Sequence, residues 1–264
     1  MLKVDRIYKV FNPGTVNQKT ALRDVSIHLE EGDFVTLIGG NGAGKSTLLN
    51  CVAGVYGVDK GAIYIAGTDV TKLPEHKRAA MLGRVFQDPM MGTASDMILE
   101  ENLALALRRG QPRSLKWGIT NKERETYRQM LSRLDLGLEN RLHTKVGLLS
   151  GGQRQAITLL MATVKKPKLL LLDEHTAALD PKTAERVLSM TDQLIKENNL
   201  TTLMITHNMR DAIKYGNRLI MMHDGRIILD IKGDEKKKLT VESLLKRFGN
   251  ASGEEFTYDR TLLS

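Results

Sequence analysis

The chain has 264 residues, of which 27% are charged and 41% are hydrophobic, as in an ordinary soluble globular protein with one large or two small domains. Its apolar runs are only strand-sized and its first residues carry no secretory signal, so we expect neither a membrane-spanning segment nor a cleaved leader. The single cysteine, Cys51, excludes an internal disulfide and favours a reducing compartment, where we expect a small buried thiol.

The net charge of +8 raises the question of an acidic partner. Basic residues are spread along the chain, with denser clusters at 108–116 and at Lys236-Lys237-Lys238. A solvated face is the commoner explanation of such runs, and attraction to anionic lipid near a membrane partner is the second. Trp117 beside the first cluster suggests base stacking, but one aromatic side chain is thin support, so we expect no nucleic-acid partner.

Short apolar runs alternate with helical periodicities, which predicts an α/β fold. Strands are predicted over residues 2–10, 21–29, 34–38, 62–65, 83–86, 168–172 and 201–206, with a hairpin formed by 218–223 and 226–230. Helices are predicted from residue 45 to about 52 and over 74–82, 100–109, 120–136, 155–163, 181–198, 209–215 and 241–248. The section at about 88–161 resembles a helical insertion in the α/β frame, and 251–264 is a polar tail expected to fray.

A phosphate-binding loop is indicated by the string GGNGAGKS after the apolar run 34–38, because its spacing is G-x-x-x-x-G-K-[ST] between a strand and a helix. Glycines let successive backbone N–H groups turn onto one anion, and the next helix adds its positive N-terminal end. We expect these residues at the nucleotide: Gly39, Gly40, Asn41, Gly42, Ala43, Gly44, Lys45, Ser46 and Thr47. Lys45 can reach the terminal phosphates and Ser46 a magnesium ion. A dinucleotide fingerprint fits worse, because Lys45 stands where its third glycine is needed.

Two carboxylates, Asp173 and Glu174, end the apolar run 169–172. Carboxyl ends of parallel strands face the ligand crevice, so both acids should lie beside the phosphate loop. Asp173 is suited to hold magnesium and Glu174 to polarise the water that attacks the γ-phosphate. A pair that merely caps a surface helix is the alternative.

A second candidate anion site is formed by Ser150, Gly151, Gly152 and Gln153, which precede a predicted helix. One triphosphate already has its binding loop at Lys45. The second site therefore requires either another nucleotide or the same nucleotide approached from a second subunit.

These strings together resemble the ATP-binding subunit of an ABC transporter over nearly the whole chain. Residues 39–46 match the Walker A loop, Gln87 the Q-loop, 149–153 the LSGGQ signature and 169–174 Walker B, while 178–180 resemble the D-loop and His207 the switch histidine. Phe11 stands where this family places an aromatic that stacks on adenine. The resemblance implies a P-loop NTPase of ABC type over residues 1–250, with a RecA-like core, an N-terminal antiparallel β-subdomain and an inserted helical subdomain.

The resemblance also implies ATP and Mg²⁺ as cofactors. Catalytic roles fall to Glu174, His207 and Gln87, and the metal to Ser46, Gln87 and Asp173. ATP would lie in a head-to-tail homodimer, between Lys45 of one chain and Ser150 to Gln153 of the other, and Asp180 of the D-loop would be among the residues that bind it.

Three residues depart from the commonest family pattern: Gly40, His175 after the catalytic glutamate, and Ala177 before the D-loop. None removes a group that the chemistry needs, so we expect an active ATPase. His175 fits a packing or interface role better than that of an additional proton carrier.

The leading hypothesis is an ATPase at the cytoplasmic face of the membrane that drives import through separate permease subunits, served by an extracytoplasmic binding protein. Residues 72–91 and 173–180 are similar to an importer group, some of whose members are thought to carry aromatic amino acids. Met90-Met91-Gly92 and Met97-Ile98-Leu99 would suit a docking surface for a permease, although burial in the core explains them about as well. A soluble ABC-type ATPase in an assembly process, such as iron–sulfur cluster biogenesis, is the alternative. A binding module without catalysis is disfavoured by Glu174 and His207.

Overall fold

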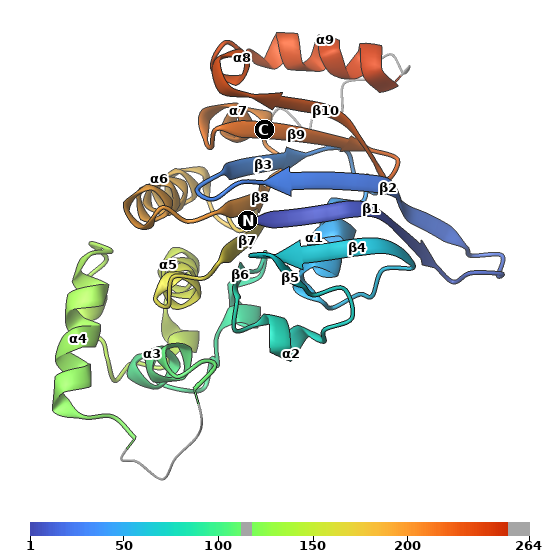
Figure 1. Cartoon of the computed structure of the whole chain (residues 1–264). Coiled ribbons are helices and arrows are strands. Elements are labelled where there is room, and N and C mark those ends of the chain that lie inside the picture. The colour runs from blue at the N-terminus through green and yellow to red at the C-terminus, as the bar shows by residue number, and fades with distance from the viewer. Residues whose placement is uncertain (112–117, 253–264) are drawn as a thin grey trace.

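The computed structural model describes residues 1–111 and 118–252. Two sheets form its centre, and helices cover the larger one (Figure 1). The smaller sheet is antiparallel with the strand order β2-β1-β4-β5. Its strands are β1 (Leu2–Phe11), β2 (Lys19–Leu29), β4 (Lys60–Ile65) and β5 (Thr68–Asp69).

The larger sheet has the strand order β10-β9-β3-β8-β7-β6, and every neighbouring pair except β9 and β10 is parallel. Its strands are β3 (Phe34–Ile38), β6 (Leu82–Val85), β7 (Leu169–Asp173), β8 (Thr202–Ile205), β9 (Arg218–His223) and β10 (Arg226–Lys232). All residues of β3 and β8 are buried, as expected for strands that are covered on both faces.

Helices cover both faces of this sheet, and their contacts with it form separate hydrophobic clusters. On one face, α1 (Lys45–Ala53) packs on alternate residues of β3, β7 and β8. The opposite face packs on α5 (Gly151–Thr163) and α6 (Pro181–Asn198). Near β9 and β10 the cover is α7 (Met209–Lys214) and α9 (Val241–Ser252).

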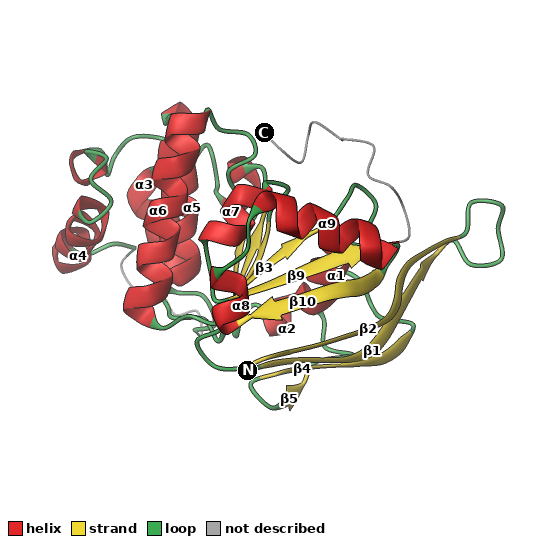
Figure 2. Cartoon of the chain, turned by 90° about the horizontal axis from the view of Figure 1, so that it is seen from above, coloured by secondary structure: helices red, strands yellow, loops and turns green. Residues whose placement is uncertain are grey.

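The expected helical section has a hydrophobic cluster of its own, to which α5 also contributes. It contains η1 (Pro89–Gly92), α3 (Leu99–Leu107), α4 (Asn121–Ser132), η2 (Leu138–Asn140) and η3 (Val146–Leu148). Figure 2 shows α3 to α6 gathered on one side and the antiparallel sheet on the other. The boundaries at 88–161 and 250 stay predictions, and most of the expected tail lies outside the described residues, as do Arg113, Lys116 and Trp117.

Several element boundaries differ from the sequence expectations. The helix expected over 74–82 is only α2 (Glu75–Arg78), because Leu82 already pairs with β7. Helix α5 begins at Gly151, four residues earlier than expected, because Ser150 and Gln153 form a capping box. The short helix α8 (Gly233–Lys237) was not expected.

The interpretation of Lys236-Lys237-Lys238 as a solvated face is wrong for Lys236, whose side chain is buried. Its Nζ donates hydrogen bonds to the carbonyls of Tyr215 and Gly216, just beyond the end of α7. Burial lowers the pKa of this amine to about 8. A cation at a helix C-terminus is favourable, so Lys236 ties α8 to the end of α7.

His175 is also buried, at the start of the segment that connects β7 to α6. Its Nε2 lies 3.1 Å from Thr191 Oγ1, and that hydroxyl donates its proton to the carbonyl of Val187 at 2.8 Å. The imidazole must therefore donate through Nε2, as a neutral ring. Burial lowers the pKa of His175 to about 4, in agreement with a packing role.

His175 makes the fold sensitive to acid. Because its folded pKa of about 4 lies below its unfolded value, its contribution to stability is complete above pH 6.5 and is lost as the pH falls from 6.5 towards 4. Between pH 7 and pH 5 this group should remove about 2 kcal/mol from the free energy of unfolding. Urea denaturation of the wild type and of His175→Gln measures this loss. The variant should lose about 2 kcal/mol less than the wild type over the same interval.

His76→Gln is the matched control, since His76 is exposed on α2. It should keep the pH dependence of the wild type. If His175→Gln and the wild type lose equal stability between pH 7 and pH 5, the buried neutral imidazole is not the source of the acid sensitivity.

Candidate active site

The parallel register brings the ends of four strands to one edge of the larger sheet. Ile205 of β8 pairs with both Leu37 of β3 and Asp173 of β7. Val85 of β6 pairs with Leu172 of β7. The residues that follow each strand therefore meet at one level: the phosphate loop after β3, Glu174 after β7, His207 after β8 and Gln87 after β6.

The phosphate loop joins β3 to α1, and α1 begins at Lys45. Lys45 Nζ donates to the carbonyls of Gly39 at 2.7 Å and Gly40 at 3.1 Å, so the ammonium group lies folded back on the loop. Burial lowers the pKa of Lys45, while the charges of Glu174 and Asp173 act in the opposite direction. Ser46 is exposed at the first turn of α1, as a ligand to an incoming ion requires.

The sharp turn before α1 depends on Gly44, whose φ is 98°. A Cβ here would also lie 2.5 Å from the carbonyl oxygen of Ala21 on β2. The loop therefore needs glycine both for its backbone conformation and for its close contact with the antiparallel sheet.

Asp173 is half-buried at the end of β7. Burial raises its pKa, and Arg84 of β6 acts in the opposite direction. Arg84 Nη2 lies 3.9 Å from Asp173 Oδ2. The carboxylate thus already has a cationic neighbour on its own chain, a contact that sequence analysis missed.

Glu174 and His207 form a pair across the ends of β7 and β8. Glu174 Oε2 lies 3.6 Å from His207 Nδ1. The polar contact with His207 lowers the pKa of Glu174, and the same contact raises the pKa of His207. Glu174 has a φ of 42°, a left-handed conformation that is uncommon outside glycine, and its N–H donates to the Ile205 carbonyl. The backbone therefore turns sharply where the candidate base stands.

The signature residues lie apart from this cluster, at the start of α5. Ser150 caps the helix: its Oγ accepts from the N–H of Gln153, and Gln153 Oε1 accepts from the N–H of Ser150. A Cβ on Gly152 would lie 2.3 Å from Thr183 Cγ2 of α6, so this glycine permits the close packing of α5 and α6. Ser150 is exposed, and the described residues show no hydrogen bond or ion pair between it and Lys45.

Asp180 caps the start of α6, three residues before Thr183, which packs against Gly152. Its Oδ1 accepts from the N–H of Thr183 at 3.1 Å, and the same interaction with Thr183 lowers its pKa. Asp180 is exposed, so this carboxylate is a helix cap that faces solvent.

Phe11, the candidate base-stacking residue, lies at the end of β1 and is half-buried. Tyr56 packs edge-on against it, with the ring centroids 5.3 Å apart and an interplanar angle of 82°. Three N–H groups, including that of Tyr56, donate to the Asn50 carbonyl at the end of α1. One helix thus connects the phosphate loop to the aromatic pair. Tyr56 was not found from the sequence, because nothing local links it to Phe11.

The donor set fits magnesium. Ser46, Gln87 and Asp173 offer one hydroxyl, one amide and one carboxylate oxygen, which are hard ligands of the kind that Mg²⁺ prefers. Among residues 1–111 and 118–252, no cluster of three His, Cys, Asp or Glu side chains could hold a metal.

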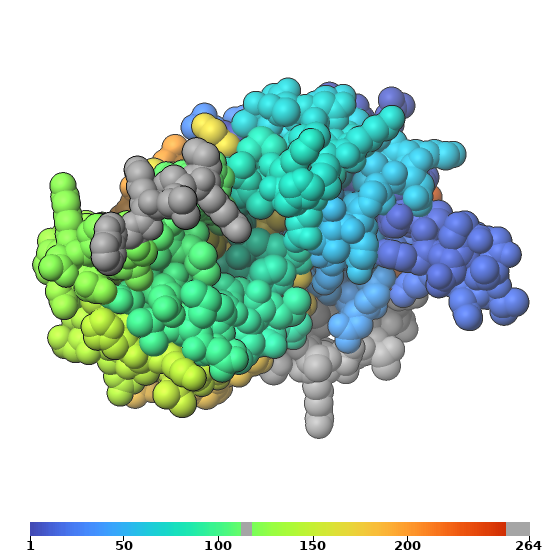
Figure 3. Space-filling view, turned by 90° about the horizontal axis from the view of Figure 1, so that it is seen from below, coloured from blue at the N-terminus to red at the C-terminus, as the bar shows by residue number. Residues whose placement is uncertain are grey.

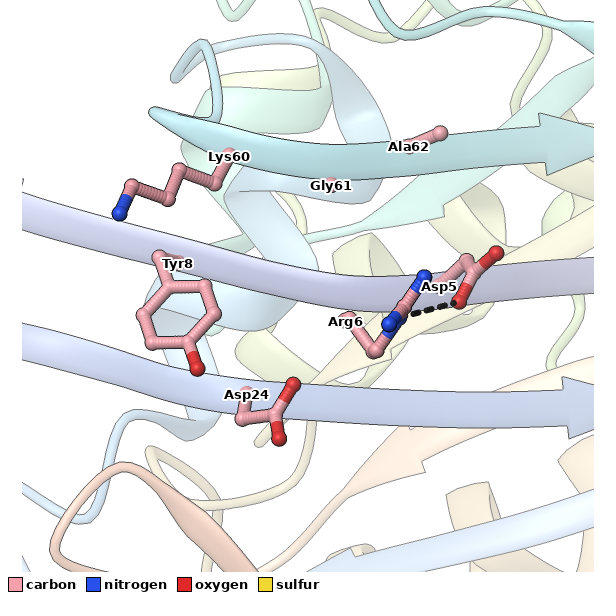
Figure 4. Close-up of a pocket in the computed structure, with 7 residues that line it drawn as sticks. All are labelled: Asp5, Arg6, Tyr8, Asp24, Lys60, Gly61 and Ala62. Carbon is pink, nitrogen blue, oxygen red and sulfur yellow. Dashed lines mark ion pairs between the residues drawn. The ribbon is translucent and has the colours of Figure 1, made fainter.

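A separate hollow lies on the outer face of the antiparallel sheet (Figure 4). Asp5, Arg6, Tyr8, Asp24 and Lys60 line it. Asp5 pairs with Arg6 at 3.5 Å, and Lys60 lies over the ring of Tyr8. The hollow includes none of the residues expected at the nucleotide.

Comparisons with known proteins show the family of this chain. A family model described as "ABC transporter" matches residues 22–177. A tyrosine transport ATP-binding protein of Clostridioides difficile (strain R20291) is 46% identical over 248 residues, which cover 94% of this chain and 98% of that protein. A methionine import ATP-binding protein of Streptococcus pneumoniae (strain ATCC BAA-255 / R6) is 32% identical over 253 residues, covering 91% and 68%.

Solved structures show the same fold. A dimeric post-hydrolysis state of an ATP-binding cassette bound to ADP and Pi aligns with a TM-score of 0.75 at 27% identity, covering 88% of this chain and 98% of that one. The ADP conformation of another cassette aligns with a TM-score of 0.76 at 29% identity, covering 94% and 98%. The chain therefore belongs to the ABC transporter family, as an ATP-binding subunit with the fold of the ATP-hydrolysing cassettes.

Proposed function

We propose that this subunit hydrolyses ATP at an interface between two copies of itself and thereby drives amino-acid import through separate permease subunits. The observation that carries the proposal is the edge formed by β3, β7 and β8, where Lys45, Glu174 and His207 lie together on one chain. The exposed start of α5 at Ser150 is the complementary half, available to a second copy. A related cassette bound to ADP and Pi is dimeric.

Each residue of the edge has a chemical task in this proposal. Lys45 exchanges its two loop carbonyls for the terminal phosphates of ATP. Glu174 is ionised, because its contact with His207 lowers its pKa, so it accepts a proton from the attacking water. His207, with its pKa raised by the same contact, donates a hydrogen bond to the γ-phosphate. Phe11 stacks on the adenine ring.

Magnesium, when bound, neutralises charge that develops on the phosphates. Ser46, Asp173 and Gln87 are the residues that would hold it. Gln87 is exposed two residues beyond β6, so it can report the state of the phosphates to the segment that follows.

The transport role is supported by relatives named for the transport or import of tyrosine, methionine and phosphonates. The relative named for tyrosine transport matches 94% of this chain, which favours an aromatic amino acid as cargo. In the part of the chain that the structure describes, no helix is long and apolar enough to cross a bilayer. In this proposal, separate permeases supply the path of the substrate across the membrane. The permeases and an extracytoplasmic binding protein make the contacts with the substrate, and this subunit lies at the cytoplasmic face.

Part of the expected docking surface is exposed. Met90 and Met91 follow the segment of Gln87, and Met91 is 68% exposed. Leu99 is different, because it is fully buried in the helical cluster, so for this residue the alternative of core burial holds. Figure 3 shows the side of the molecule on which α2 and α3 lie. We propose that the permease docks at Met90 and Met91.

Replacing the candidate base tests the hydrolytic mechanism. Glu174→Gln should keep ATP binding and lower turnover about 100-fold or more, since it removes the proton acceptor but keeps the shape. The variant should also accumulate as an ATP-bound dimer. Phosphate release and size-exclusion chromatography with ATP measure both effects.

Glu185→Gln is a matched control, because Glu185 is an exposed carboxylate of α6 that pairs with Lys214. It should hydrolyse ATP at the wild-type rate. Undiminished hydrolysis by Glu174→Gln would reject Glu174 as the base.

The docking surface is tested by Met91→Asp. A charge at this exposed apolar position should greatly reduce co-purification with a co-expressed permease, while the ATPase activity of the isolated subunit stays unchanged. Val16→Asp is the control, since Val16 is a fully exposed apolar residue in the β1–β2 connection. Equal permease recovery with both variants would place the docking surface elsewhere, and co-purification of the wild type with soluble partners alone would favour an assembly ATPase.

The cargo is tested by uptake of labelled tyrosine in cells that express the whole system. Wild-type cells should accumulate tyrosine and Glu174→Gln cells should not, because uptake depends on turnover. Labelled methionine is the comparison, and preferential uptake of methionine would contradict an aromatic cargo.

A further inference from the structure

Arg84 of β6 lies among three elements of the site without being one of the expected site residues. Its Nη2 donates to Asn50 Oδ1 of α1 at 2.6 Å and lies 3.9 Å from Asp173 Oδ2 of β7. The guanidinium carbon is 4.5 Å from the centroid of the Phe86 ring, which immediately precedes Gln87. Only 14% of the Arg84 side chain is exposed.

The strand register explains why Arg84 meets Asp173. Arg84 pairs with Leu171, and Asp173 follows two residues later on the same face of β7, since side chains alternate along a strand. This is the face covered by α1, where Leu169 and Leu171 belong to the hydrophobic core. Asn50 lies on α1, which covers this face, and accepts the hydrogen bond from Arg84 there.

The contacts of Arg84 are not those that stability alone would favour. A guanidinium taken from water needs hydrogen bonds to compensate for lost hydration. Within the described residues, Arg84 Nε is buried without a hydrogen-bond partner, and the 3.9 Å contact with Asp173 is too long to be a hydrogen bond. Arg218 of β9 offers a contrast, because it has the same exposed fraction but makes two hydrogen bonds of 2.7 and 2.6 Å to Asp230.

Arg84 and a divalent ion would compete for the carboxylate of Asp173. Both cations would share one carboxylate, so each weakens the binding of the other. The arginine is also attached to Phe86 by its stacked ring and to Asn50 by its hydrogen bond. A shift of the guanidinium therefore acts directly on the residue before Gln87.

We propose that Arg84 is a positioning residue with two roles. Before a metal ion is bound, its guanidinium balances the charge of Asp173. When the site is occupied, the guanidinium would be displaced from Asp173 and would move the Phe86–Gln87 segment. This inference rests on the proposed magnesium site at Ser46, Gln87 and Asp173. Arg84 would thereby couple the metal site to the segment that precedes Met90 and Met91, the proposed docking residues.

Arg84→Met tests the charge balance, since it keeps a long side chain and removes the cation. The Mg²⁺ concentration that half-saturates binding of a non-hydrolysable ATP analogue should fall about threefold or more, because a competing charge beside Asp173 is gone. Binding is followed by calorimetry, independently of turnover. Arg84→Lys keeps a cation and should stay closer to the wild type.

The coupling to the Gln87 segment is tested with Phe86→Trp in a Trp117→Phe background. Its fluorescence should change when Mg²⁺ and the analogue are added together, and this change should be lost when Arg84→Met or Arg84→Lys is also present, because neither keeps the planar stack.

Arg218→Met is the matched control for loss of an equally buried arginine. It should lower the unfolding temperature without moving the Mg²⁺ half-saturation. If Arg84→Met behaves in the same way, Arg84 is merely structural and the proposal is overturned while the metal site stands. If analogue binding by the wild type does not depend on Mg²⁺ at all, the metal site is rejected, and the proposal with it.

Discussion

The register of three parallel strands is the constraint on which the site depends. Because Ile205 pairs with both Leu37 and Asp173, the phosphate loop, the acidic pair and His207 all emerge at one level of the sheet. Asp173 lies on β7 itself, and Glu174 and His207 follow within two residues of the ends of β7 and β8. The α1 helix reinforces the same geometry, since it starts at Lys45 and ends where Tyr56 packs against Phe11. One helix thus links the proposed phosphate site to the proposed base-stacking pair.

The same surface forms one half of the proposed nucleotide site. The groups that handle water and the γ-phosphate are already close together, with Glu174 and His207 in contact. The start of α5 at Ser150, the proposed second phosphate-binding site, packs on α6 through Gly152, and Ser150 is exposed. In the proposed assembly, a second copy arranged head to tail completes each of the two half-sites. Under this proposal, nucleotide binding would draw two chains together and hydrolysis would release them, so that a reaction at the phosphate loop would move a membrane partner.

Much of this site could be predicted because its signals are local. The phosphate-loop string and the acids after an apolar strand each combine a motif with its immediate context, and the capping box of Ser150 and Gln153 was present in the sequence although the start of α5 was set too late. What could not be predicted depends on tertiary contacts. Lys236 is buried because α8 places this one lysine against the carbonyls beyond the end of α7, and the proposed role of Arg84 depends on partners on α1 and β7. A charge in a short strand gives no local sign of which carboxylate it will face.

The head-to-tail site is tested most directly by cross-linking two kinds of singly labelled chain. One carries Asn41→Cys in the phosphate loop and the other Ser150→Cys at the start of α5, while Cys51 stays silent because it is buried and its pKa is raised to about 11. The two are mixed with ATP in a Glu174→Gln background and treated with a short bismaleimide. The account predicts a cross-linked product between the two different chains, dependent on ATP, and little product within either kind alone. Cross-linking of like chains only, or equal cross-linking without ATP, would contradict a nucleotide held between two copies.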